Sequence, residues 1–228
     1  MNDTAIHQNI AKLRERIRTA AQNCGRDPDS ITLLAVSKTR PAGAVRAAAN
    51  CGVNDVGENY LQEALEKLQA LEDLALHWHF IGPLQSNKTR EVASHFSWVH
   101  SVDRLKIAKR LSDQRPERLG SLNVCLQVNI SNEASKAGLA VANVPDLARE
   151  VAQLPRLRLR GLMAIPAPPI GSTDPRAPFA ALRALQQSLQ KEHPELDTLS
   201  MGMSGDMEAA IAEGATVVRI GTDIFGPR

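Results

Sequence analysis

One lysine stands where its amine can act on a bound molecule. In the segment ITLLAVSKTR (residues 31–40), an apolar run ends in Ser37-Lys38-Thr39-Arg40, and Pro41 follows. The pattern predicts a buried strand that stops near the lysine. In parallel α/β proteins, side chains at the carboxyl ends of strands face the ligand crevice. An amine there is a solvated surface group, a phosphate partner or a nucleophile, and this run alone leaves all three open.

A second group of useful residues lies near the C-terminal end of the sequence. Ser204 stands in MGMSGD, just before a predicted helix, and Gly221 and Thr222 follow the last predicted strand. Backbone N–H groups at a helix start favour an anion, and barrels often bind phosphate in the loops after strands seven and eight. Each motif alone is more simply a helix start or a turn, but the two together predict a phosphate site.

Arg219 interrupts a run that is otherwise suited to full burial, Val217–Ile220. A buried guanidinium keeps its proton and needs an acceptor, which is either a carboxylate of the protein or a ring nitrogen of a ligand. An amine, a phosphate cradle and an arginine between them describe a site for pyridoxal 5′-phosphate (PLP). Lys38 would form an imine with the aldehyde, and Arg219 would face the pyridine nitrogen.

Strands and helices alternate along the rest of the chain. A first helix over residues 4–23 carries Ile6, Ile10, Leu13 and Ile17 on one face. Eight predicted strands follow, at residues 31–37, 54–57, 78–82, 98–101, 122–130, 157–163, 198–201 and 216–220. This order, with no break in composition, predicts a single (β/α)8 barrel domain over residues 1–228, preceded by one extra helix. An open doubly wound sheet is the alternative.

Composition excludes several classes of protein. The net charge is +2 and aromatic residues make up 3% of the chain, with no clustered basic face for nucleic acid. The three cysteines, Cys24, Cys51 and Cys125, are scattered and odd in number, which suits a reducing compartment. We find no signal sequence and no apolar stretch of membrane-spanning length, so we expect a cytoplasmic protein without a membrane partner.

Several motifs together resemble the PLP homeostasis (PLP-binding) protein family, whose members are related to the N-terminal domain of bacterial alanine racemase (fold-type III). The motifs are AVSKTR, DVGENYLQEALEK, WHFIGPLQSNK, QVNIS with SKAGL, GLMAIP and LSMGMSGDMEAAIAEGATVVRIGTDIFG. The similarity extends in order over essentially the whole chain. It implies a single PLP barrel with Lys38 as the Schiff-base lysine and Arg219 at the pyridine nitrogen. It also implies that Ser204, Gly221 and Thr222 lie at the phosphate and that Asn59, His79 and Met163 line the pocket.

The choice between carrier and enzyme depends on what the sequence offers for proton transfer. Alanine racemases have a further β domain that supplies a catalytic tyrosine from the partner subunit, and we expect no such domain here. Tyr60, the only tyrosine, is interpreted as the first packing residue of the helix that follows GEN. Racemisation needs an acid and a base on opposite faces of the substrate, and Lys38 supplies one of them. If Arg219 donates to the pyridine nitrogen, the ring is a weaker electron sink.

The sequence therefore favours a non-catalytic protein that carries or buffers PLP in vitamin B6 homeostasis. A weakly active PLP-dependent amino-acid racemase and an interaction module that no longer uses PLP are the alternatives. We expect a monomer that binds PLP and other B6 vitamers and meets apo PLP enzymes transiently.

Three features remain open at this stage. Lys136 either holds a second PLP or phosphate or is a solvated lysine. His77 and His79 lie on one face of a strand, where packing or hydrogen-bonding histidines are favoured over a metal site. The proline-rich segment 165–178 predicts a loop on the same face as Lys38, either a lid or a passive surface loop.

Overall fold

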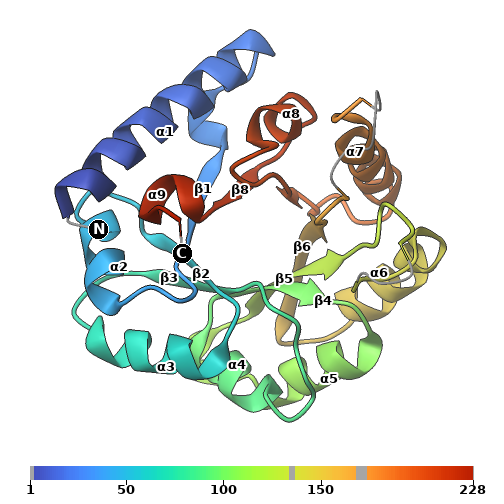
Figure 1. Cartoon of the computed structure of the whole chain (residues 1–228). Coiled ribbons are helices and arrows are strands. Elements are labelled where there is room, and N and C mark those ends of the chain that lie inside the picture. The colour runs from blue at the N-terminus through green and yellow to red at the C-terminus, as the bar shows by residue number, and fades with distance from the viewer. Residues whose placement is uncertain (1–2, 134–136, 168–173, 228) are drawn as a thin grey trace.

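Eight parallel strands close into a barrel in the computed structural model, which describes residues 3–133, 137–167 and 174–227 (Figure 1). The strands are β1 (Thr32–Val36), β2 (Asp55–Glu58), β3 (His77–Phe80), β4 (Trp98–Val102), β5 (Leu122–Gln127), β6 (Leu157–Met163), β7 (Thr198–Ser200) and β8 (Val217–Ile220). β1 pairs with β8, with Leu34 opposite Arg219. The predicted (β/α)8 barrel is therefore confirmed, and the alternative of an open sheet is wrong.

Helices surround the barrel and connect its strands (Figure 1). They are α1 (Asp3–Asn23), α2 (Ala42–Ala49), α3 (Leu61–Ala70), α4 (Thr89–His95), α5 (Leu105–Gln114), α6 (Val144–Ala152), α7 (Ala177–Leu189), α8 (Met207–Ala212) and α9 (Thr222–Phe225). The sequence did not predict α9, because four residues are too few to show helical periodicity. None of the helices in the described ranges is both long and apolar enough to cross a bilayer.

The extra helix α1 packs beside the place where the barrel closes. Its predicted apolar face is buried, with Ile6, Ile10, Leu13 and Ile17 each at most 5% exposed. It contacts α2, which follows β1, and also α8 and α9, which flank β8. Each buried aliphatic side chain stabilises this packing by about 1.5–3 kcal/mol, as an upper estimate. α1 thus joins the first and last parts of the barrel.

Tyr60 differs from its sequence interpretation. It precedes α3 in an extended conformation, and 54% of its surface is exposed. The interpretation as the first packing residue of the helix is therefore wrong, because α3 begins one residue later and the extended backbone turns this side chain away from the core. Lys136 and residues 168–173 of the proline-rich loop lie outside the described residues.

Close contact between two strands makes Gly161 a sensitive position. A Cβ on this β6 residue would overlap the backbone oxygen of Thr198 on β7, so the two strands would have to move apart. We expect Gly161→Ala to lower the free energy of unfolding by about 2 kcal/mol or more, measured by urea denaturation.

Gly43→Ala is the matched control for this substitution. The added methyl group on α2 meets nothing within 4 Å, and alanine favours a helix by about 0.5–1 kcal/mol over glycine. Equal stability of Gly161→Ala and the unaltered protein would show that the strands have room for a side chain at this position.

Candidate cofactor site

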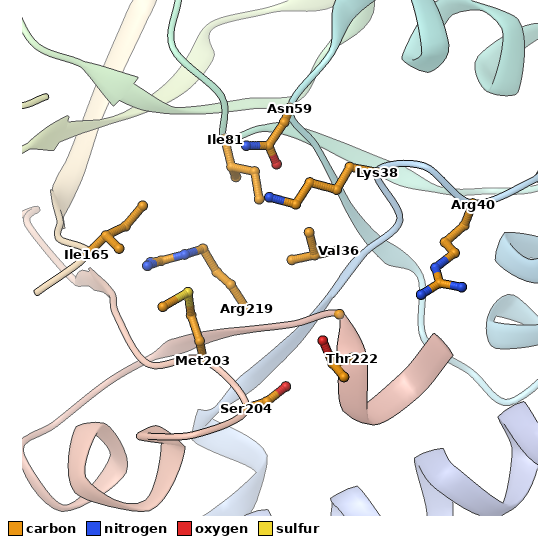
Figure 2. Close-up of a pocket in the computed structure, with 11 residues that line it drawn as sticks. Val36, Lys38, Arg40, Asn59, Ile81, Ile165, Met203, Ser204, Arg219 and Thr222 are labelled. Atoms are coloured by element: carbon orange, nitrogen blue, oxygen red, sulfur yellow. The ribbon is translucent and has the colours of Figure 1, made fainter. Parts of the chain in front are cut away.

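A cavity of about 240 Å³ lies at the carboxyl ends of the strands (Figure 2). Residues from both ends of the sequence line it, because β1 and β8 are neighbours in the closed barrel. The lining residues are Val36, Lys38, Arg40, Asn59, Ile81, Ile165, Met203, Ser204, Arg219, Gly221 and Thr222. The structure thus brings together six of the predicted site residues: Lys38, Asn59, Ser204, Arg219, Gly221 and Thr222.

Lys38 extends into this cavity toward Asn59 and Ile81 (Figure 2). The residue before it is fixed by a buried ion pair between Lys67 on α3 and Glu58 on β2, whose Nζ and Oε1 atoms are 2.6 Å apart. Lys67 Nζ donates to the carbonyl oxygen of Ser37 at 2.7 Å, and the Ser37 hydroxyl donates to Glu58 Oε1 at 2.5 Å. Burial raises the pKa of Glu58, and the hydrogen bonds from Lys67 and Ser37 oppose that effect.

The residue after Lys38 is held as well. Thr39 has a φ of 64°, in the left-handed region that a β-branched residue rarely adopts. Its backbone N–H donates to Glu63 Oε2 on α3 at 2.8 Å, which compensates for that conformation. The chain on both sides of Lys38 is therefore anchored to β2 and α3, so the lysine extends from a fixed base.

Asn59 meets the cavity from the end of β2. Gly82, after β3, lies so close that a Cβ there would overlap the Asn59 backbone, and its carbonyl oxygen accepts from the Ser101 hydroxyl at 2.6 Å. The Asn59 Oδ1 atom is buried and has no hydrogen-bond partner within the described residues. A buried polar atom without a partner is costly, so Asn59 is suited to a polar group of a ligand.

Arg219 lies at the floor of the cavity and is 4% exposed. Its Nη1 donates to the carbonyl oxygen and to the hydroxyl of Ser200, and its Nη2 donates to the Ala164 carbonyl oxygen at 2.8 Å. Burial lowers its pKa to about 10, so the guanidinium stays charged at neutral pH. No carboxylate of the described residues forms an ion pair with it, and its Nε–H and one Nη2–H remain for a ligand.

The loops after β7 and β8 meet at the other side of the cavity. Ser204 and Thr222 lie near one another in Figure 2, and Gly221 allows the second loop to approach Val36, whose oxygen would be 3.3 Å from an added Cβ. Asp206 Oδ1 accepts from the Met203 backbone N–H at 2.6 Å and closes the first loop. Two hydroxyls and adjacent backbone N–H groups suit a phosphate at the place where barrels commonly bind one.

One arginine of α1 connects these two loops from behind. Arg16 Nε donates to Glu208 Oε1 on α8 at 2.9 Å, and Nη1 donates to Asp223 Oδ2 on α9 at 2.5 Å. Its Nη2 also reaches the carbonyl oxygen of Ser204 at 3.4 Å. No role for this arginine is predicted from the sequence, because nothing in the pattern connects position 16 with positions 204–223.

Two residues that were predicted to line the pocket lie outside its lining. Met163 and His79 are buried, at 0% and 2% exposure, and neither is among the residues that line the cavity. His79 Nε2 is 3.0 Å from Asp55 Oδ1, and His77 Nδ1 is 3.4 Å from the same oxygen. The interpretation as a hydrogen-bonding histidine is confirmed for His79, whereas His77 is exposed and makes the longer ionic contact. In the described ranges, no group of three or more His, Cys, Asp or Glu side chains is arranged to hold a metal.

Several lining residues were not predicted. Val36, Ile81, Ile165 and Met203 are apolar and gave no chemical signal in the sequence. Arg40 lines the cavity, and its Nη2 donates to the carbonyl oxygens of Gly226 at 2.6 Å and Pro227 at 2.9 Å. It therefore fixes the C-terminal segment next to the site.

Comparisons with known proteins agree with this geometry. Residues 5–228 match the family model described as alanine racemase, N-terminal domain. The chain is 64% identical over 225 residues to the pyridoxal phosphate homeostasis protein of Pseudomonas aeruginosa, covering 99% of this chain and 96% of that protein. It is 54% identical over 234 residues to the protein of the same name from Escherichia coli, covering 100% and 98%.

Solved structures show the same relationship. The PipY protein of Synechococcus elongatus, solved with PLP bound, has a TM-score of 0.84 and 41% identity, with 97% of this chain and all of that chain covered. Alanine racemase from Corynebacterium glutamicum has a TM-score of 0.72 at 17% identity and is covered over 62% of its length, which shows the shared fold.

The barrel and its site thus define a member of the alanine racemase N-terminal domain family. Within that family, the chain belongs to the pyridoxal phosphate homeostasis proteins.

Arg16→Ala tests the connection between the two loops. We expect the dissociation constant for PLP, measured by fluorescence titration, to rise about threefold to fivefold, because the two ion pairs are partly exposed and together are worth about 1 kcal/mol.

Arg18→Ala is the control, since Arg18 lies on the same helix and, within the part of the chain that the structure describes, forms its ion pair with Glu15 one turn earlier. The same affinity in Arg16→Ala and Arg18→Ala would mean that the loops keep their arrangement without this connection.

Proposed function

We propose that this protein binds PLP through a covalent bond to Lys38 and carries or buffers the cofactor in intracellular vitamin B6 homeostasis. The observation that supports this most is that an amine, a buried guanidinium and two loops with hydroxyl groups line one cavity: Lys38, Arg219, Ser204 and Thr222. These groups match the aldehyde, the pyridine nitrogen and the phosphate of PLP.

Different residues of the cavity bind different parts of PLP. When bound, PLP supplies an aldehyde that condenses with a lysine amine with loss of water. Ser204, Gly221 and Thr222 hold the phosphate, and Arg219 donates a hydrogen bond to the ring nitrogen. The names of the relatives and the PLP-bound PipY structure support the same cofactor.

The lining favours binding over turnover. Besides Lys38, its charged side chains are Arg40 and Arg219, and the described lining includes no carboxylate, imidazole or phenol. The described residues that line the cavity therefore provide no second acid–base group for the opposite face of a substrate. A cationic Arg219 also keeps the ring nitrogen unprotonated, which weakens electron withdrawal. Weak racemase activity is the second candidate, since Lys38 can still move a proton on one face.

Other partners follow from the same contacts. Pyridoxal keeps the aldehyde but loses the phosphate contacts, and pyridoxamine phosphate keeps the phosphate but has no aldehyde for Lys38. Both should therefore bind more weakly than PLP. Apo PLP enzymes are the proposed recipients of the cofactor. The cytoplasm is the proposed location, because its reducing conditions are compatible with the free thiols of Cys24, Cys51 and Cys125.

We propose that the protein is a monomer. A closed barrel has no open sheet edge on which a second copy could extend the sheet. Sedimentation velocity is expected to give one species near the chain mass of 24.7 kDa, with and without PLP. A species of twice that mass would replace this proposal with a dimer.

Lys38→Ala tests the covalent bond. We expect the purified protein with PLP to show a visible absorption band, and we expect Lys38→Ala to lose it because the amine is gone. Lys109→Ala is the control, since this lysine is exposed on α5 and should leave the band unchanged. Borohydride reduction followed by peptide mapping should place the adduct on Lys38.

A screen for amino-acid racemisation distinguishes the two candidates. A carrier gives the band without proton exchange at Cα, whereas an enzyme gives both. A protein that stays colourless with excess PLP, with no adduct after reduction, would exclude both candidates.

A further inference from the structure

A line of hydrogen-bonded side chains crosses the barrel from the cavity toward the opposite end; we call it the polar relay. Arg219 Nη1 is 2.9 Å from Ser200 Oγ, which is 2.7 Å from His100 Nδ1. His100 Nε2 is 2.9 Å from His79 Nδ1, and His79 Nε2 is 3.0 Å from Asp55 Oδ1. Because β4 and β7 are not neighbours, the contact between His100 and Ser200 spans the barrel interior.

The direction of every hydrogen bond in the polar relay follows from its two ends. A guanidinium can only donate, so Ser200 Oγ accepts from Arg219 and gives its own proton to His100 Nδ1. His100 then carries its proton on Nε2 and donates to His79 Nδ1. His79 carries its proton on Nε2 and donates to Asp55, a carboxylate that can only accept. Both ends require the same arrangement.

A charged histidine would break this pattern. With a proton on His100 Nδ1, Ser200 Oγ would accept from two donors, and its own proton would have no acceptor among its recorded partners. A second cation would also lie one hydroxyl away from Arg219, deep inside the protein. Burial lowers the pKa of His100 well below the usual 6.5 and also lowers that of His79, which agrees with neutral rings.

The charges at the two ends complete the arrangement. Burial acts to raise the pKa of Asp55. The hydrogen bond from His79, together with the nearby His77, outweighs burial and holds this pKa below its usual value. A cation therefore stands at one end of the polar relay and an anion at the other. The dipoles between them all point the same way, which stabilises both charges without direct contact.

We propose that His100 is a positioning residue for Arg219. By accepting the Ser200 proton, it turns a lone pair of Ser200 Oγ toward the guanidinium and keeps the other N–H groups of Arg219 directed at the cavity. The consequence for PLP rests on the function proposed above. His79 and Asp55 in turn fix the proton of His100 on Nε2.

Histidine NMR tests the polar relay in the protein without PLP. Long-range ¹⁵N–¹H correlation spectra of the six histidines should show His79 and His100 as neutral rings protonated on Nε2 from about pH 6 to pH 8. His100→Asn and His79→Asn variants assign the two signals. A proton on Nδ1 of His100, or a charged His100 at neutral pH, would overturn the proposal before any cofactor is added.

Variants test the consequence for PLP. His100→Leu removes the acceptor for the Ser200 proton, so PLP should dissociate about tenfold faster, the equivalent of one charge-assisted hydrogen bond at about 1.4 kcal/mol. His100→Asn places an amide oxygen near the position of Nδ1 and should restore most of the slow dissociation. Ser200→Ala should behave like His100→Leu. His77→Asn is the control, since His77 shares Asp55 but lies outside the polar relay.

The two proposals fail in different ways. Dissociation at the unaltered rate in both His100→Leu and Ser200→Ala would overturn the positioning role, while the Lys38 band would remain. Loss of the band in the unaltered protein would overturn PLP binding, while the histidine spectra would still report the polar relay. Equally fast dissociation in His100→Asn and His100→Leu would show that ring packing matters and not the accepted proton.

Discussion

The buried charge of Arg219 is the constraint on which the rest of the site depends. A guanidinium at 4% exposure cannot lose its proton and must find acceptors inside the barrel. Ser200 and the Ala164 carbonyl oxygen supply them, and the polar relay continues from Ser200 toward Asp55. The remaining N–H donors of Arg219 are left for a ligand. The burial of this cation therefore also determines that the cavity floor offers hydrogen-bond donors.

The two walls of the cavity are held by different means. On the β1 side, a buried pair of Lys67 and Glu58 fixes the backbone at Ser37, next to Lys38. On the β8 side, partly exposed ion pairs of Arg16 connect the loops that carry Ser204 and Thr222. The ion pair on the β1 side is therefore buried, while the contacts on the β8 side are partly exposed, so water and salt can weaken them. This difference suits the proposed carrier, which would bond its ligand covalently and later release it.

The same arrangement supports the proposal of a carrier over that of an enzyme. A PLP racemase needs acid–base groups on both faces of a substrate. The described lining of this cavity offers Lys38, two arginines, the uncharged polar residues Asn59, Ser204 and Thr222, and apolar side chains. Tyr60, at 54% exposure beside the site, is not part of the lining. The apolar residues Ile165 and Met203 are partly exposed at the cavity, where a recipient protein could reach the ligand.

The sequence by itself determined the barrel, the buried face of α1 and the types of residue at the site, because these follow from local periodicity and from single residues out of place, such as Arg219. Only the tertiary structure decided which side chains support them. Arg16 meets residues 188 or more positions away, and His100 meets Ser200 a hundred positions away. Such contacts depend on how the barrel closes and on strand register, which no local pattern contains. The placement of His79 in the polar relay, and of Tyr60 outside the core, was decided at that level.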